Sequence, residues 1–136
     1  MLRREDYIIR VIQEFGDALM RIINKKHPHG ELQSDQSFND LFSTYLGESR
    51  AFFINADLNE IVEFFEKDPT NSLQKLNMLS NLFYEEILNQ NISPHRFTLI
   101  IKTLDIYDYL NKNTKEFSLE RNQNEQALRF LLSEMS

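Results

Sequence analysis

Residues 94–110 constrain the fold most, because they carry apolar side chains around almost the whole circumference of a helix. Two apolar faces are predicted, the first made of Phe97, Ile100, Ile101, Leu104 and Tyr107 and the second of Leu99, Ile106 and Leu110. Only a narrow polar stripe separates them, made of Thr98, Lys102, Asp105 and Tyr109. A helix that is apolar nearly all round is buried between neighbours. We therefore expect this helix at the centre of a layered stack of helices.

Further helices are predicted wherever apolar residues recur at steps of three and four or a start signal precedes them. The first has its main apolar stripe at Ile8, Ile12, Phe15, Leu19 and Ile22. Start signals are Ser37, the Asp57/Glu60 capping pair, Asp68-Pro69, Ser93-Pro94 and Ser118, and Gly47 is a predicted C-terminal cap. The predicted helices cover about 5–25, 37–46, 58–66, 69–89, 94–110 and 119–134.

The composition agrees with an all-helical fold. The 136 residues include three Gly and three Pro, and this scarcity of turn-forming residues disfavours β-sandwiches and phosphate-binding loops. A chain of this length can bury about two thirds of its unfolded surface, so one core suffices without disulfides or metal. We predict an all-α fold of about six helices, a layered bundle of helix hairpins that forms one domain over residues 1–136.

Cysteine content and charge exclude several classes of function. With no Cys in the chain, disulfides, thiolate nucleophiles and Cys-type zinc sites are excluded. Residues 31–72 carry two basic and nine acidic side chains, which makes contact with nucleic acid phosphates improbable there. Apolar runs are too short to span a bilayer, and the first residues lack the apolar core of a signal peptide. We expect a cytoplasmic protein that binds neither nucleic acid nor membrane.

A metal site is conceivable at the turn that follows the first helix. His27, His29 and Glu31 place two imidazoles and a carboxylate within five residues, and such groups are common metal ligands. An isolated His-x-His in a turn is more often simply exposed to solvent. No His in the sequence follows a Glu by three positions, as the ligands of di-iron bundles do. We therefore expect no metal and no other cofactor.

The late part of the central helix offers a candidate pocket. Asp105 and Asp108 lie one turn apart with Tyr107 and Tyr109 beside them, and paired carboxylates can perform acid–base chemistry. A structural interpretation is simpler, because Asp105 falls in the polar stripe and Asp108 near the helix end, where solvent or Arg121 would satisfy it. No phosphate loop, nucleophile elbow or HExxH motif is present. We expect no enzyme activity, and the alternative is a small enzyme or ligand-binding protein with an inter-helix pocket near Asp108.

Some apolar residues exceed what one core needs. Ile9 and Met20 lie three helical turns apart on a flank beside the main apolar stripe of the first helix. The other surplus residues are Phe53, Phe64, Met78 and Leu82. Most of these should be buried by another layer, and the rest could form a contact surface. We predict Ile9, Met20 and Phe53 as contacts to a protein partner or to a second copy in a homodimer.

The chain resembles a family of small uncharacterised bacterial proteins in three segments, Asp6-Tyr7-Ile8-Ile9-Arg10, Tyr84-Glu85-Glu86 and Tyr109-Leu110 with Phe117-Ser118-Leu119-Glu120-Arg121. Members of that family are helical and similar to tetratricopeptide-type helix hairpins. The resemblance covers most of the chain and is thinnest over residues 27–57. It implies a tetratricopeptide-like stack and no activity. The function expected from the sequence is a non-enzymatic helical interaction module of a bacterial cytoplasm.

Overall fold

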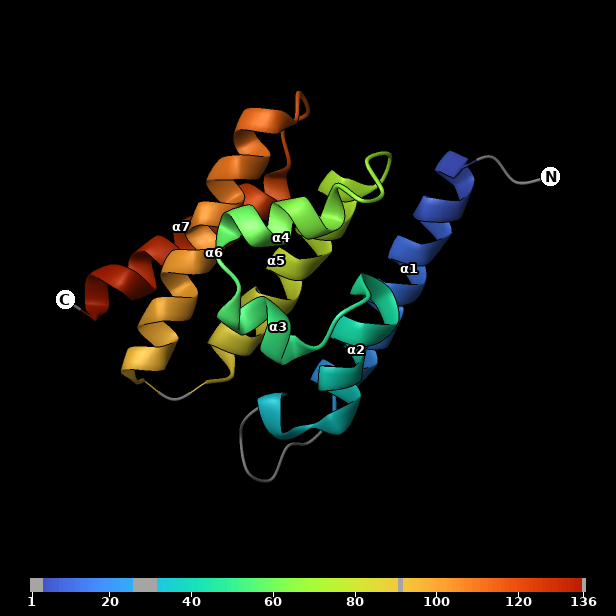
Figure 1. The fold of residues 1–136 in the computed structure, drawn as a ribbon. Coiled ribbons are helices and arrows are strands. Elements are labelled where there is room, and N and C mark those ends of the chain that lie inside the picture. The colour runs from blue at the N-terminus through green and yellow to red at the C-terminus, as the bar shows by residue number, and fades with distance from the viewer. Residues whose placement is uncertain (1–3, 26–31, 91, 136) are drawn as a thin grey trace. The chain divides into compact units, whose positions relative to one another are not determined.

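The computed structural model describes residues 4–25, 32–90 and 92–135, and every regular element in these residues is a helix (Figure 1). The α-helices are α1 (Arg4–Ile23), α2 (Gln36–Leu46), α3 (Arg50–Asn55), α4 (Leu58–Phe65), α5 (Ser72–Leu88), α6 (Pro94–Asn113) and α7 (Leu119–Glu134), and the short 3-10 helix η1 (Leu32–Ser34) precedes α2. The all-α prediction is confirmed. The chain divides into two compact units, Met1–Asn55 and Ala56–Ser136, and the assignment of one domain stays a prediction.

The first unit is built around aromatic side chains. Helix α1 packs on α2. The rings of Phe15 and Tyr45 pack edge-on, with their centroids 5.5 Å apart. The buried face of α1 consists of Ile8, Phe15, Leu19 and Ile22. Ile12, predicted with this face, is instead exposed, because the contact with α2 is narrower than the apolar stripe. Helix α3 was missing from the predicted elements, since six residues are too few to show a helical period.

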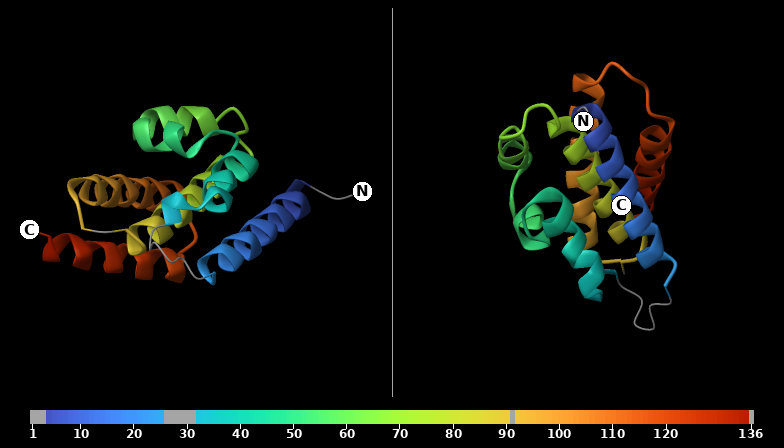
Figure 2. Two further views of the ribbon diagram at one scale, coloured as in Figure 1. Left: turned by 90° about the horizontal axis from the view of Figure 1, so that it is seen from below. Right: turned by 90° about the vertical axis from the view of Figure 1, so that its right-hand side faces the viewer.

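The second unit places α6 at its centre. Helix α6 contacts α4, α5 and α7. Figure 1 and Figure 2 show α6 running beside α5 and α7. Its buried apolar residues are Leu99, Ile100, Leu104, Ile106, Tyr107 and Leu110. The predicted central position is therefore confirmed. Phe97 and Ile101 are exceptions, because both are exposed although the sequence predicts them in the core.

Local capping explains where most helices begin. Asp57 and Glu60 form a reciprocal capping box at the start of α4. The Ser93 hydroxyl accepts from the Arg96 backbone N–H ahead of Pro94, and the Ser118 hydroxyl accepts from that of Arg121. These three predicted starts are confirmed.

Glycine at position 47 ends α2 as predicted. Gly47 has a φ of 87°, and its N–H donates to the carbonyl oxygen of Ser43. A positive φ strains residues that have a Cβ atom, so glycine is favoured at this cap.

Two predicted starts are displaced. Helix α5 begins at Ser72 and not at Pro69, because the Asn71 N–H donates to the Asp68 carbonyl oxygen and closes a turn there. The Asp68 carboxylate is occupied by the Asn71 side-chain amide at 2.9 Å and does not cap a helix at Pro69. Helix α2 begins one residue before Ser37, since the Asp35 carboxylate accepts from the Ser37 backbone N–H at 2.8 Å.

Candidate functional site

Among the described residues of the first unit, exposed apolar side chains form a stripe on α1. Ile9, Ile12 and Met20 are 52%, 38% and 54% exposed, and Ile23 is half-buried. At about 100° per residue, these side chains and Gly16 between them fall within a sector of about 80° next to the buried face. We call Ile9, Ile12, Gly16, Met20 and Ile23 the α1 stripe. Two of the three predicted contact residues, Ile9 and Met20, therefore lie on the surface.

Phe53, the third predicted contact residue, is a core residue. Its side chain is fully buried, and its ring centroid lies 6.2 Å from that of Phe42 and 5.1 Å from that of Phe52. The prediction that Phe53 contacts a partner is wrong. The doublet Phe52-Phe53 has one half-buried and one buried member, and the sequence alone does not indicate which ring enters the core.

The residues of the predicted pocket face different surroundings. Asp105 and Asp108 are exposed, Tyr107 is buried and Tyr109 is half-buried. Asp105, Asp108 and Tyr109 lie within about 100° of one another around α6, whereas Tyr107 points to another side of the helix. Tyr109 lies by a small cavity that α4 and α5 also line, through Val62, Phe65, Glu66, Ser72, Leu73 and Leu76. The structure does not group Tyr107 with the other three residues, and the pocket near Asp108 stays a prediction.

The predicted partner of Asp108 is also different. The Arg129 guanidinium lies 3.8 Å from its carboxylate, and both side chains are more than half exposed. An exposed pair at this distance contributes little to stability. Arg121, expected to satisfy Asp108, donates from Nε to Asn111 Oδ1 at 2.9 Å.

Tyr107 is the most deeply buried tyrosine and carries the largest change in acidity. Burial raises the pKa of Tyr107 far above its ordinary value, and the carboxylates of Glu120 and Glu125 add to this. The Asn124 side chain opposes the shift, although no hydrogen bond of normal length and angle joins the Tyr107 hydroxyl to any described residue. The hydroxyl is protonated at all physiological pH values.

Two side chains on α5, Glu85 and Tyr84, also have raised pKa values. Burial, and then the charge of Glu120, raises the pKa of the Glu85 carboxyl. Burial, and then the charge of Glu85, raises the pKa of Tyr84. Each leading cause is burial between packed helices, which structural side chains share with catalytic ones. These shifts alone do not identify a reaction site.

Lys102, in the polar stripe of α6, has a structural role. Its ammonium group donates to the carbonyl oxygen of Ala56 and so connects α6 to the segment that leads into α4. Burial lowers the pKa of Lys102, while the carboxylates of Asp57 and Glu60 oppose this change. Lys102 therefore interrupts the apolar surface of α6, and a tertiary hydrogen bond to Ala56 satisfies its ammonium group.

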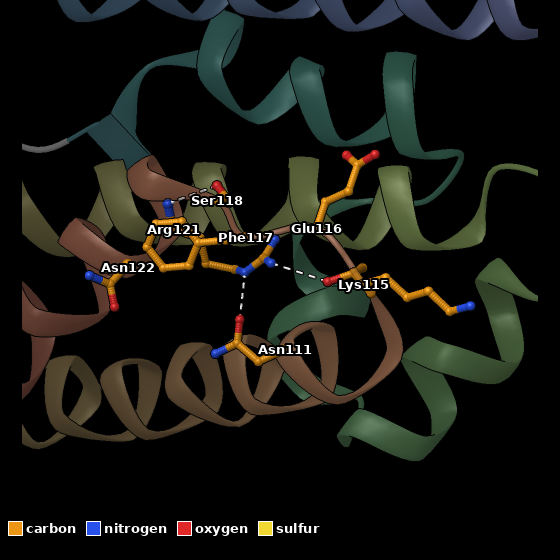
Figure 3. A pocket seen from close by; sticks show the side chains of 8 residues that line it. Asn111, Lys115, Glu116, Phe117, Ser118, Arg121 and Asn122 are labelled. Carbon is orange, nitrogen blue, oxygen red and sulfur yellow. Dashed lines mark hydrogen bonds between the residues drawn. The ribbon is translucent and has the colours of Figure 1, made fainter.

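A pocket of about 270 Å³ lies at the turn between α6 and α7 (Figure 3). The Arg121 guanidinium crosses it, donating from Nε to Asn111 and from Nη2 to Thr114 Oγ1 at 3.3 Å. These two hydrogen bonds tie α7 to the end of α6, so the arginine has a structural partner on each side. The sequence does not reveal them, because the partners lie seven and ten positions away.

A second apolar surface lies where α6 begins and α7 ends. An open groove of about 730 Å³ is lined by the apolar side chains of Ile92, Pro94, Phe97, Leu131 and Met135, with Ser93, Arg96, Thr98 and Glu134 beside them. Arg96 is mostly buried, and its Nε donates to the Ile87 carbonyl oxygen at 3.1 Å. This groove accounts for the exposure of Phe97, because α7 covers only part of the α6 surface.

Metal and membrane sites were also predicted to be absent. Within residues 4–25, 32–90 and 92–135, no three His, Asp or Glu side chains are grouped so that they could hold a metal ion. His27, His29 and Glu31 lie outside these ranges. None of the helices described there combines the length and the apolarity that a bilayer crossing requires.

Comparison with known proteins adds no relative. No protein-family model matches the chain, and no curated protein or solved structure is significantly similar to it. The resemblance to small bacterial proteins with tetratricopeptide-type hairpins stays a prediction from the sequence. Function must therefore be inferred from the surfaces of the two units.

Proposed function

We propose that the protein is a non-enzymatic helical module that binds another protein chain through the α1 stripe. The observation that carries this proposal is the exposure of Ile9, Ile12 and Met20 along one side of α1. Isolated apolar residues on a surface need no explanation, but contiguous ones mark interaction sites. The absence of Cys and the resemblance to bacterial proteins support a bacterial cytoplasm as the setting.

The alternative, a small enzyme or ligand-binding protein near Asp108, has less support. Its two carboxylates, Asp105 and Asp108, are both exposed and lie apart from the buried Tyr107. General acid–base catalysis depends on groups positioned together around a substrate. A thermal-shift screen with divalent metals and common metabolites tests this alternative, because a ligand that binds only the folded state raises the melting temperature. We expect no shift.

Site-specific photo-crosslinking tests the proposed function. The photoreactive amino acid p-benzoyl-phenylalanine replaces Met20 on the stripe or, as a control, Tyr7. Tyr7 is 59% exposed and lies about 180° from the centre of the stripe around the helix. Irradiation of cells that produce the protein should yield a covalent adduct with another chain from position 20 and not from position 7.

A second substitution separates docking from unfolding. Ile9→Asp in the Met20 photo-crosslinking variant should abolish the adduct, because a carboxylate would have to lose its hydration in the interface. The far-UV circular dichroism spectrum should stay unchanged, since Ile9 is already half exposed to water. Equal adducts from positions 7 and 20, or none from position 20, would refute docking through the stripe.

A further inference from the structure

We propose that the occupant of the α1 stripe is a second copy of this chain, and that the two α1 helices cross antiparallel at Gly16. This inference rests on the proposed function and names its partner. The two copies would be related by a two-fold axis through the crossing point. Such an interface requires a surface that is complementary to itself.

The spacing of the stripe meets this requirement. Ile12 and Met20 lie four positions before and after Gly16, and Ile9 and Ile23 lie seven positions before and after it. In an antiparallel pair that crosses at Gly16, Ile9 of one copy therefore meets Ile23 of the other. Ile12 likewise meets Met20. Every apolar side chain of the stripe thus faces an apolar side chain of the second copy.

Among the described residues, nothing packs against the Cβ position of Gly16. Apart from its chain neighbours and the backbone of its own helix, a Cβ atom built at this position would meet no described atom within 4 Å, and a glycine inside a helix is less stable than alanine. The distance between two packed helices depends on the size of the side chains at their contact. A glycine at the crossing point lets two α1 backbones approach closely, which explains its position at the centre of the stripe.

The charges of α1 do not oppose this pairing. The stripe itself contains no ionisable side chain, so association buries no unpaired charge. Arg10, Glu14, Asp17 and Arg21 lie outside the stripe and are exposed. The whole of α1 carries three cations and four anions, a net charge of −1 against −6 for the full chain, so the acidic character of the chain is not concentrated on the contacting helix.

The contact is small, and the dimer should therefore be weak. Few partly exposed apolar side chains from each copy become buried, and interfaces of this size are typical of transient complexes. We expect a dissociation constant on the order of 10–100 µM. Sedimentation equilibrium of the full chain between about 5 and 500 µM covers this range and should show a monomer–dimer equilibrium.

Gly16→Leu is the decisive substitution. Leucine favours a helix more than glycine does, and the site has space for a side chain in the single copy, so the helical content and melting temperature of the monomer should not fall. The bulky side chain separates the crossing helices, and the dissociation constant should rise at least about tenfold. A matched Tyr7→Leu variant should dimerise like the unmodified chain.

Introduced cysteines test the antiparallel arrangement, because the chain has none of its own. Under mild oxidation, an equal mixture of Ile9→Cys and Ile23→Cys should form disulfide-linked heterodimers more readily than either variant links to itself. Tyr7→Cys serves as the control and should not crosslink above the level of random collision. Preferential linkage of Ile9→Cys to itself would indicate a parallel pair and overturn the proposed geometry.

The outcomes separate this inference from the proposed function. A chain that stays monomeric at the highest concentration, or a Gly16→Leu variant that dimerises as tightly as the unmodified chain, would overturn the homodimer. If the photo-crosslinked partner from position 20 is then a different protein, docking through the stripe stands and only its occupant is wrong. If sedimentation and crosslinking both detect a dimer that Gly16→Leu weakens, the second copy is the partner.

Discussion

Removing the Tyr107 hydroxyl should stabilise the protein. Tyr107 is 1% exposed, and its Oη has no hydrogen-bond partner of normal geometry in the described part of the chain. An unpaired buried polar group costs about 1–3 kcal/mol of folding free energy. Tyr107→Phe removes this group and preserves the ring, so the free energy of unfolding at pH 7 should rise by about 1 kcal/mol.

The stability gained by Tyr107→Phe should increase at high pH. The pKa of Tyr107 is raised above the ordinary value of 10.0, mainly by burial. The unfolded chain therefore loses this proton near pH 10 while the folded chain still holds it. Below pH 10 the Tyr107 proton therefore makes its full contribution to the free energy of unfolding. Above pH 10 the free energy of unfolding falls by up to about 1.4 kcal/mol per pH unit. Tyr107→Phe lacks this loss, so its advantage over the unmodified chain should widen above pH 10.

Urea unfolding followed by circular dichroism measures both effects. The unmodified chain and Tyr107→Phe are compared at neutral pH and just above pH 10, with Tyr109→Phe as the control on the same helix. Tyr109 is only half-buried, so its substitution should change stability by less than about 0.5 kcal/mol at pH 7. If Tyr107→Phe instead loses about 1 kcal/mol, the hydroxyl is hydrogen-bonded, by Asn124 or by water, and the reasoning is wrong.

Four further substitutions test other parts of the structure by urea unfolding. Phe53→Ala should cost about 3–5 kcal/mol, because a fully buried ring is removed from the first unit; a loss below about 1 kcal/mol would restore Phe53 as a surface residue. Gly47→Ala should cost about 1–2 kcal/mol, since its φ of 87° is left-handed, and an unchanged midpoint would contradict this cap. Asp57→Ala removes one half of the α4 capping box and should cost about 1 kcal/mol, whereas no loss would show that the cap is dispensable. Asp108→Asn should change stability by less than about 0.5 kcal/mol, because its pair with Arg129 is exposed; a gain above about 1 kcal/mol would indicate a strained acid in a site.

Local signals in the sequence were sufficient for most helix boundaries. Ser93-Pro94, Ser118 and the Asp57/Glu60 pair each act within a few residues, through hydrogen bonds to backbone groups that every helix start leaves unpaired. Such bonds form independently of the rest of the fold. The all-α class and the start sites of α4, α6 and α7 therefore follow from the sequence alone. Asp68-Pro69 failed because Asn71 competes for the same carboxylate.

The candidate site was only partly predictable. The flank position of Ile9 and Met20 follows from helical spacing, and both side chains are exposed. The symmetry of the stripe about Gly16 was present in the sequence but has meaning only once Ile12 is known to lie on the surface. Tyr107 does not join the expected pocket near Asp108, because side chains two positions apart on a helix, such as Tyr107 and Tyr109, point to nearly opposite sides.

The sequence by itself determined most of the helical segments, α3 excepted, and which residues are apolar enough to be buried. Only the tertiary structure decided which of those residues are covered. Ile8 and Ile12 share one period on α1, yet Ile8 is buried and Ile12 is exposed. Phe97 is exposed on α6, whereas Leu99 is buried on the same helix. The physical reason is that periodicity gives the direction of a side chain, whereas its burial depends on how far neighbouring helices extend over it, which no local pattern encodes.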